Sequence, residues 1–290
     1  LYAALTNHQP EYLLVMLILL VAVLDMVSSR NNVVLRLLER PFYYLSVCFV
    51  NVVLSIILNV YFIQFCGLGL WGAIIALLCV SLIQFLLLTP IIIMSCKFVL
   101  FNKNLLKQML RFSFSFFPAA VFFVLIEMSD RWLLGYLLGV NEVGLYGAGY
   151  KIGSIVLLLV NSFNLNWQPY YLKTGIKNGV SAFQNIGEHF ILILLFSSTI
   201  LSILWPIIFK YIIGEAFWEG GNIVPIICSS YIFYGLFILQ MPSIYLAKKQ
   251  NWAPLFWGSG FIINLLINFL LIPRFGIYGA AYATLLAYFT

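Results

Sequence analysis

Long apolar stretches, separated by short polar or Gly- and Pro-containing segments, follow one another along the whole chain. A stretch of about 18 or more apolar residues can cross the hydrocarbon core of a bilayer as a helix. The pattern predicts nine such segments. They cover approximately residues 12–35, 42–65, 70–96, 106–139, 144–168, 182–212, 221–246, 252–272 and 277–290. The last is shorter than the ~20 residues that a full span needs, so we expect the chain to stop inside a helix.

The composition is typical of an integral membrane protein. Charged residues make up 8% of the chain and apolar residues 63%, and the mean hydropathy is +1.05. A soluble domain has roughly 25% charged residues. A soluble chain as apolar as this one would expose patches far larger than the ~400 Å² that solubility tolerates. Soluble enzymes and nucleic-acid-binding proteins are therefore excluded.

The basic residues lie almost entirely on one side of the predicted spans. Alternate connections carry 11 Lys and Arg residues on one side and two, Lys210 and Arg274, on the other. The positive-inside rule places the richer side in the cytoplasm. The cytoplasmic set comprises Arg30, Arg36, Arg40, Lys97, Lys103, Lys107, Arg111, Lys173, Lys177, Lys248 and Lys249.

An internal repeat of about 208 residues relates the two ends of the chain. An offset of 207 residues places Gly69 on Gly276, each followed by an aliphatic residue, an aromatic residue, Gly and Ala. A gap of two residues then brings further polar positions into register. These pairs are Asn59 with Asn268, Ser55 with Asn264, and Arg40 with Lys249. Six predicted helices separate the copies, so both face the same way, as in a parallel repeat.

The repeat predicts an all-α polytopic protein of two pseudo-symmetric six-helix bundles, of which this chain is a fragment with about nine transmembrane helices. Residues 1–104 would be the C-terminal half of the N-lobe, equivalent to helices four to six. Residues 105–290 would be the C-lobe, helices seven to twelve, with the last one truncated. The offset places the start of the first unit about 100 residues before Leu1.

The predicted fourth and fifth helices resemble the polysaccharide transporter family within the multidrug/oligosaccharidyl-lipid/polysaccharide exporter superfamily. The residues that carry the resemblance are Ser129-Asp130-Arg131-Trp132, Leu134-Gly135, Gly139, Val143-Gly144-Leu145-Tyr146 and Gly149-Tyr150-Lys151. It continues from Arg36 to Gly72 and from Asn264 to Ala283. The resemblance implies a flippase that moves undecaprenyl-diphosphate-linked repeat units of O-antigen or capsule across the bacterial inner membrane. It also implies other polysaccharide-assembly proteins as partners, besides membrane lipids.

Arg131 and Lys151 are the candidate substrate-binding residues. Each lies ~10 to 12 Å below the outer end of one predicted helical hairpin, so they can be neighbours at one depth. Charges at that depth are costly and usually face a cavity or the bundle interior. Two cations there would suit a diphosphate, to which Arg offers a bidentate fork and Lys a mobile point charge.

Internal charge pairing is the alternative interpretation. Glu127 lies four residues before Arg131 on one helix face, so the two can neutralise each other. Asp130 can neutralise Lys151 in the same way. Carboxylates deep in a membrane can also titrate. Asp25, Glu127 and Asp130 are therefore candidates for ion coupling or charge pairing.

Two other functions compete with the flippase. A multidrug or cation antiporter of the same superfamily would want an acidic cavity, whereas the two clearest positions here are basic. A membrane polysaccharide polymerase or glycosyltransferase would need acid/base residues on a substantial aqueous loop, and the connections are short. We therefore expect no enzyme and no catalytic residues. The five cysteines have no C-x-x-C spacing, so we expect no metal site and no cofactor.

Overall fold

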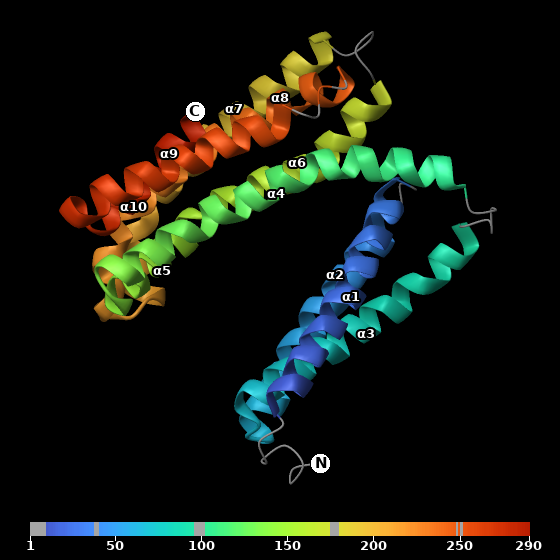
Figure 1. Ribbon diagram of the computed structural model, residues 1–290. Helices are drawn as coiled ribbons and strands as arrows, with labels where there is room; N and C mark the ends of the chain where they lie inside the picture. Colours follow the sequence, from blue (N-terminus) through green and yellow to red (C-terminus); the bar gives the residue numbers. More distant parts are fainter. Residues whose placement is uncertain (1–9, 38–40, 96–101, 175–179, 248, 250–251) are drawn as a thin grey trace. The chain divides into compact units, whose positions relative to one another are not determined.

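Helices make up all the regular structure that the computed structural model describes (Figure 1). The description covers residues 1–290 except 1–9, 38–40, 96–101, 175–179, 248 and 250–251. The chain divides into two compact units, Leu1–Phe101 and Asn102–Thr290. The helices begin and end where the apolar stretches meet polar or Gly-containing segments, as expected when burial of the backbone in lipid favours helices.

The first unit is a small three-helix bundle in which α1 and α2 both pack against α3. Leu35, Val47 and Leu88 form a small buried apolar cluster, and Ile74, Ala76 and Val80 on α3 are buried as well. Most of its remaining large apolar side chains are exposed, as lipid-facing residues are. The elements are α1 (Pro10–Leu37), α2 (Pro41–Asn59), the π-helical η1 (Val60–Phe65) and α3 (Gly69–Ser95).

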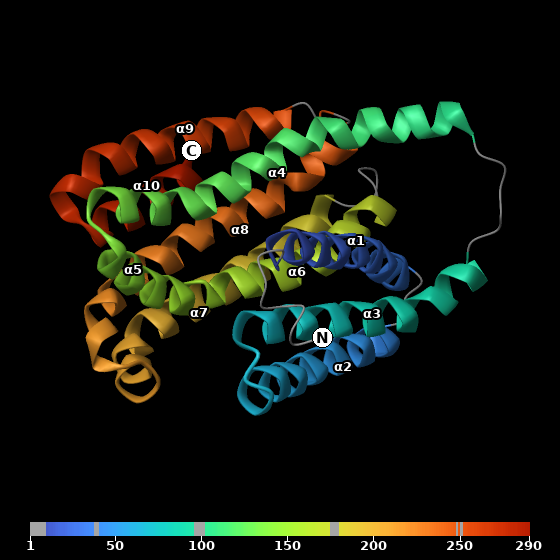
Figure 2. The ribbon, with the colours of Figure 1, turned by 60° about the horizontal axis from the view of Figure 1, so that its bottom comes forward.

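The second unit has a larger core and more layers. The long α4 packs along α9, α10 fits between α8 and α9, and α8 also contacts α6 and α7 (Figures 1 and 2). Pro118 lies inside α4. The elements are α4 (Lys103–Leu137), α5 (Val140–Gly153), α6 (Ile155–Thr174), α7 (Val180–Ile212), the 3-10 helix η2 (Glu215–Ile223), α8 (Val224–Leu246), α9 (Trp252–Phe275) and α10 (Ile277–Phe289).

Almost all described residues of the nine predicted segments are helical, but the segment 144–168 is divided between α5 and α6, and fewer than nine helices qualify as full spans. Among the described residues, seven helices are long and apolar enough to cross a membrane, and an eighth is added if α5 and α6 form one span. These two are bent by 44° at a break beside Ser154. α10 has 13 residues and is too short. The expected count of nine is therefore reduced to seven or eight, and the chain is a multi-pass membrane protein.

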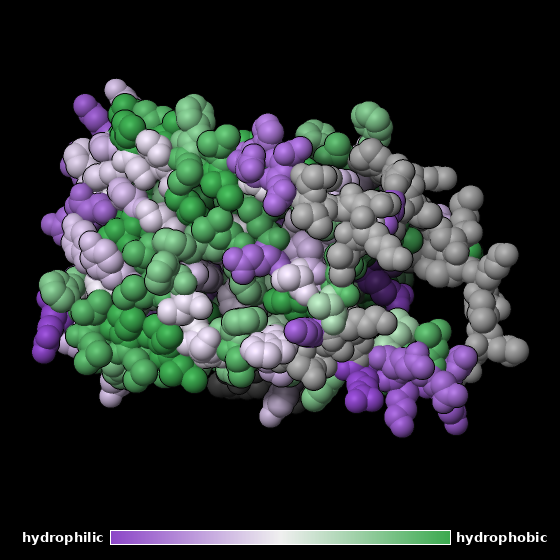
Figure 3. Space-filling view, turned by 90° about the horizontal axis from the view of Figure 1, so that it is seen from above, coloured by the Kyte–Doolittle hydropathy of each residue, from purple (hydrophilic) through white to green (hydrophobic). Residues whose placement is uncertain are grey.

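The outer surface agrees with a lipid environment. Figure 3 shows hydrophobic residues spread widely over the face seen from above, with polar residues in scattered groups. Large apolar side chains such as Phe49, Phe196 and Leu270 are more than half exposed. A soluble protein would bury such side chains, because their contact with water is unfavourable.

The two Gly-containing turns that the repeat aligns share local geometry. Gly69 and Gly276 both have positive φ, 50° and 56°, which strains any residue with a Cβ. Three residues later, a Cβ atom on Gly72 would collide with the backbone of Phe62, and one on Gly279 would collide with that of Leu271. The likeness concerns these two hairpins, and the pseudo-symmetry of whole bundles stays a prediction.

A close backbone approach within the second unit joins α5 to η2. A Cβ atom on Gly149 would overlap the carbonyl oxygen of Gly220, and one on Gly220 would overlap that of Leu145. Without a strong hydrophobic driving force between helices in lipid, such contacts between small residues contribute through close packing. By contrast, Gly147 on the same helix has open space where its Cβ would be.

We expect Gly149→Ala to destabilise the protein by about 1–3 kcal/mol, because overpacking forces α5 and η2 apart. Gly147→Ala is the matched control, and should leave the stability unchanged or raise it by up to about 1 kcal/mol through helix propensity. Thermal unfolding in detergent, followed by tryptophan fluorescence, measures both. An equal Tm for the two variants would contradict the close approach.

Candidate functional site

A carboxylate buried inside the second unit joins four helices. Asp130 on α4 is 1% exposed. Its Oδ1 accepts hydrogen bonds from the side-chain amides of Asn268 at 2.7 Å and Asn264 at 3.2 Å, both on α9. Its Oδ2 accepts from the hydroxyls of Tyr146 on α5, at 2.6 Å, and Thr284 on α10. All these partners are uncharged, so nothing among them offsets a negative charge on Asp130.

The amide oxygens around Asp130 enlarge this cluster. Ser129 donates to Asn264 Oδ1 at 2.6 Å, and Asn268 Nδ2 donates to the same oxygen at 3.0 Å. The Oδ1 atom of Asn268 is buried and accepts no hydrogen bond from the described residues. Carboxylate, amide and hydroxyl oxygens are thus gathered in one buried place, and one of them has an unused acceptor site. We call Ser129, Asp130, Tyr146, Asn264, Asn268 and Thr284 the Asp130 cluster.

One helical turn earlier, Glu127 is surrounded by phenol groups. Its carboxylate accepts from Tyr150 at 2.8 Å, Tyr288 at 2.5 Å and Tyr231 at 3.2 Å. The hydroxyl of Tyr231 also lies 2.6 Å from that of Tyr150. Glu127 is only partly buried, unlike Asp130. The three tyrosines come from α5, α8 and α10, so this second carboxylate also ties α4 to its neighbours.

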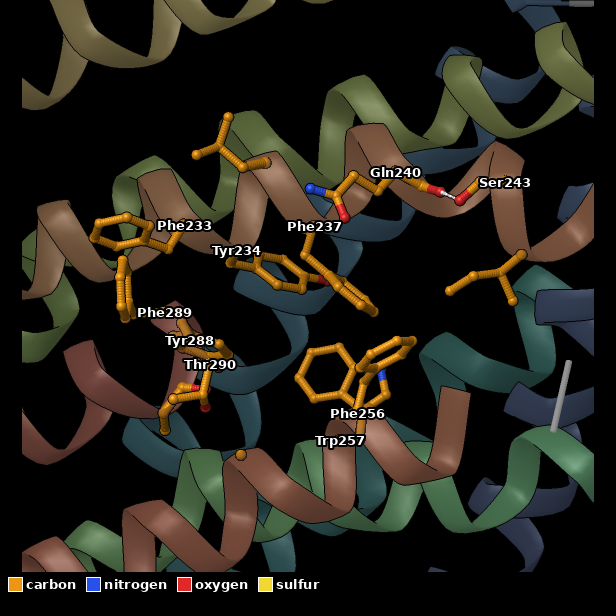
Figure 4. A pocket seen from close by; sticks show the side chains of 14 residues that line it. Phe233, Tyr234, Phe237, Gln240, Ser243, Phe256, Trp257, Tyr288, Phe289 and Thr290 are labelled. Carbon is orange, nitrogen blue, oxygen red and sulfur yellow. Dashed lines mark hydrogen bonds between the residues drawn. The ribbon is translucent and has the colours of Figure 1, made fainter. Parts of the chain in front are cut away.

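Tyr288 connects Glu127 with a cavity between α8, α9 and α10. The cavity has a volume of about 440 Å³. Figure 4 shows its aromatic lining, which includes Tyr234, Trp257 and Tyr288, and the polar Gln240 and Ser243 at another part of the wall. Glu127 is therefore one side chain away from an open space, whereas the Asp130 carboxylate is enclosed.

Arg131 and Lys151, the predicted substrate-binding residues, both lie close to these networks without joining the carboxylates. The guanidinium of Arg131 stacks over the ring of Tyr150, 4.6 Å from its centroid, and donates to the main-chain oxygen of Glu127 at 3.0 Å. Lys151 is exposed. Within the described part of the chain, the hydrogen bonds to Glu127 and Asp130 come from neutral side chains instead of from these two cations.

Asp25, the third predicted acidic residue, lies in the first unit. Its side chain is exposed on α1 and accepts a hydrogen bond from Ser81 on α3 at 2.6 Å. It lines a polar groove of about 460 Å³, where Asn51 also donates to Gln84 at 2.9 Å. The structure therefore brings Glu127 and Asp130 together on one helix and places Asp25 in a separate polar environment.

Sequence reasoning missed the uncharged partners of the carboxylates. The phenols of Tyr146, Tyr150, Tyr231 and Tyr288 and the hydroxyl of Thr284 had no assigned role. A signal was available in Asn264 and Asn268, which stand four residues apart in an apolar helix and so share a face. Two amides on one face of a membrane helix need partners, because unpaired polar groups are costly in hydrocarbon.

Metal coordination by several acidic, His or Cys side chains is not indicated. Among the described residues, no group of three or more His, Cys, Asp and Glu residues is placed to hold a metal ion. The oxygens of the Asp130 cluster come instead from one carboxylate, two amides and hydroxyls. Such a set can hold a proton or a weakly bound monovalent cation near a single negative charge.

The sequence matches a family model described as polysaccharide biosynthesis protein, over residues 1–174. This segment is more than half of the 290 residues. The chain belongs to the polysaccharide biosynthesis protein family. The resemblance to polysaccharide transporters is thereby confirmed. For this family member, no curated protein and no solved structure gives a match.

The match to the polysaccharide biosynthesis protein family covers the α4–α5 part of the site. Glu127, Asp130, Arg131 and Lys151 all lie within it, whereas the α9 and α10 residues that complete the Asp130 cluster lie beyond it. The geometry can therefore hold a carboxylate in a membrane without a basic partner, and keep two cations nearby.

The hydrogen bonds of Asp130 predict a specific order of stabilities. Asp130→Leu leaves two amide donors and two hydroxyls buried without their acceptor, so we expect a loss of about 3 kcal/mol or more. Asp130→Asn keeps an oxygen toward the two amides, and its NH₂ group can donate to hydroxyls that rotate to accept. We expect this variant to lose less than about 1.5 kcal/mol.

Thermal unfolding in detergent measures this order, with Glu215→Gln as the control for the loss of an exposed carboxylate. The Glu215 variant should unfold at the wild-type temperature. A Tm for Asp130→Leu equal to that of Asp130→Asn would show that the hydrogen bonds contribute little.

Proposed function

We propose that this protein is a flippase for undecaprenyl-diphosphate-linked oligosaccharide repeat units in the bacterial inner membrane. It would move them from the cytoplasmic to the outer leaflet for surface polysaccharide assembly. Membership of the polysaccharide biosynthesis protein family supports this class of substrate. The observation that carries the proposal is the arrangement of charges on α4. Glu127 and Asp130 accept hydrogen bonds from neutral donors, and the cation Arg131 lies beside them without a described ion pair to either carboxylate.

The two cations are assigned to the head group. Arg131 keeps part of its guanidinium for a ligand because its known contacts are one carbonyl oxygen, the Tyr150 ring and the sulfur of Met128. Lys151 is exposed on the neighbouring helix. A diphosphate between them would receive a bidentate contact and a mobile point charge. The polyprenyl chain would stay in lipid.

The carboxylates are assigned to energy coupling. An ionised carboxylate held only by neutral donors is unfavourable in a low-dielectric interior, so it favours binding of a proton or a monovalent cation. Taking up and releasing such an ion as two bundles rock would link transport to an ion gradient. Each charge moved across the membrane contributes about 2.3 kcal/mol per 100 mV. Asp130 is the primary candidate, Glu127 the second, and Asp25 the corresponding candidate in the first unit.

The competing functions fit the observations less well. A cation antiporter would bind its substrate at an acidic, accessible cavity, yet the most exposed charge near the site is the cation Lys151. A polymerase or glycosyltransferase needs acid/base groups in water, and the described outer connections, such as residues 138–139 and 213–214, are too short to build such a site.

Transport of a fluorescent polyprenyl-diphosphate sugar between leaflets of proteoliposomes tests the substrate assignment. We expect Arg131→Ala and Lys151→Ala to reduce the exchange rate by about tenfold each, the effect of losing one charged contact to a phosphate. Arg274→Ala, which removes an exposed cation from the end of α9, is the matched control. Normal exchange in both variants would show that Arg131 and Lys151 do not bind the substrate and have a structural role. Transport of a cationic dye alone would favour the antiporter.

The same proteoliposomes test coupling. We expect an imposed gradient of either H⁺ or Na⁺ to accelerate exchange by the wild type, and Asp130→Asn to abolish this acceleration while leaving slow exchange. The two gradients applied separately identify the ion. Full acceleration in folded Asp130→Asn would move the coupling role to Glu127 or Asp25. Loss of acceleration in Glu127→Gln would then assign the role to Glu127, and full acceleration would assign it to Asp25.

A further inference from the structure

Tyr150 on α5 is fixed by hydrogen bonds to two other helices. Its side chain is 4% exposed. The hydroxyl donates to Glu127 Oε2 on α4 at 2.8 Å and accepts from the hydroxyl of Tyr231 on α8 at 2.6 Å. A phenol has one hydrogen to donate and can also accept, so both functions of this hydroxyl are in use. The Tyr150 ring is therefore held in one place inside the second unit.

The fixed ring of Tyr150 carries the guanidinium of Arg131. The Cζ atom of Arg131 lies 4.6 Å from the ring centroid. Both described hydrogen bonds of the guanidinium use Nη1, which donates to the main-chain oxygen of Glu127 at 3.0 Å and to the sulfur of Met128 at 3.8 Å. Among the described residues, Nη2 and Nε donate no hydrogen bond. These two nitrogens form one edge of the guanidinium, and such an edge can contact two phosphate oxygens.

Tyr150 contacts two opposite charges of α4 at once. Glu127 and Arg131 stand four residues apart, a spacing at which an acid and a base on one helix can interact. The hydroxyl of Tyr150 bonds the carboxylate, and the face of its ring attracts the cation. One side chain therefore gives each charge a neutral partner, and an edge of the guanidinium remains available to a ligand.

A fixed guanidinium binds an anion better than a mobile one. An arginine side chain has many rotamers, and ordering it when a ligand binds reduces the affinity. The Tyr150 ring and the main-chain oxygen of Glu127 order Arg131 in advance, without touching the ligand. The attraction between a cation and an aromatic face is stronger where water is excluded, as it is beside a ring that is almost fully buried.

We propose that Tyr150 is the positioning residue of the head-group site, because it holds the guanidinium of Arg131 in the orientation that binds a diphosphate. The inference rests on the proposed flippase function, in which Arg131 contacts the head group. It adds a requirement that charge alone does not impose, namely an aromatic ring fixed by Glu127 and Tyr231. Glu127 thereby acts on substrate binding through Tyr150, in addition to its candidate role in ion coupling.

A double-mutant cycle tests the proposal, with equilibrium binding of geranylgeranyl diphosphate to the purified protein in neutral detergent as the readout. We expect Tyr150→Leu, which removes the ring, to weaken binding by about tenfold. In the Arg131→Ala background, Tyr150→Leu should change the affinity by less than about twofold, because the side chain that Tyr150 orients is absent. A residue that served packing alone would weaken binding equally in both backgrounds.

Two milder variants keep the test decisive if Tyr150→Leu does not fold. Tyr150→Phe keeps the ring and loses both hydrogen bonds that fix it, so we expect binding to weaken by about threefold. Arg131→Lys keeps the charge and loses the planar fork, and should weaken binding by about tenfold in the wild type and by less in Tyr150→Phe. Tyr288→Phe is the matched comparison. It removes another phenol donor from Glu127, but Arg131 has no described contact with the Tyr288 ring, so the affinity should stay at the wild-type value.

Three results would overturn the role of Tyr150: wild-type affinity in folded Tyr150→Leu or Tyr150→Phe, equal losses with and without Arg131, or a loss in Tyr288→Phe as large as that in Tyr150→Phe. Thermal unfolding in detergent identifies the variants that fold. Failure of the proposed function gives a different pattern. If the wild type neither binds the probe nor exchanges lipid between leaflets, the flippase function is refuted. If Arg131→Ala alone weakens binding and Tyr150→Leu acts independently of it, only the positioning role is refuted.

Discussion

The carboxylate of Asp130 is the point on which the packing of the second unit depends. It accepts hydrogen bonds from α5, α9 and α10 at once, and it does so from a helix whose other contacts are mainly apolar. In lipid, apolar contacts between helices have little advantage over contacts with acyl chains, so directional bonds and close packing decide which helices associate. Glu127 repeats this arrangement one turn away with three phenols. Together the two carboxylates fix both the rotation and the depth of α4.

Neutral donors have a particular consequence for how this centre behaves. A hydroxyl can either donate or accept, so tyrosine and threonine can remain hydrogen-bonded whichever protonation state the carboxylate adopts. An ion pair with Arg or Lys would favour the ionised state alone. A network of this kind therefore tolerates a change of charge with little rearrangement of the backbone.

The segmentation of the chain could be read from the sequence because the bilayer imposes a simple rule, namely that a spanning helix is apolar for about 20 residues. The break at Ser154 was not predicted, although Gly153 and Ser154 form the kind of pair at which helices kink. The acidic residues of the site were predicted from the cost of charge in a membrane. Their partners were not, because hydrogen bonds between Asp130 and Thr284 join positions 154 residues apart. The structure describes hydrogen bonds from neutral donors to both carboxylates, and the pairing of charges four residues apart stays a prediction.

Pro118 divides α4 into two parts that are held by different numbers of contacts. Proline has no N–H group to donate to the carbonyl four residues before it, so the helix lacks one of its own bonds at this point. The half that follows is anchored by the two carboxylates, whereas residues 102–111 of the half that precedes are exposed. Bending of α4 should therefore concentrate about residue 118, because the later half is held by the hydrogen bonds of Glu127 and Asp130.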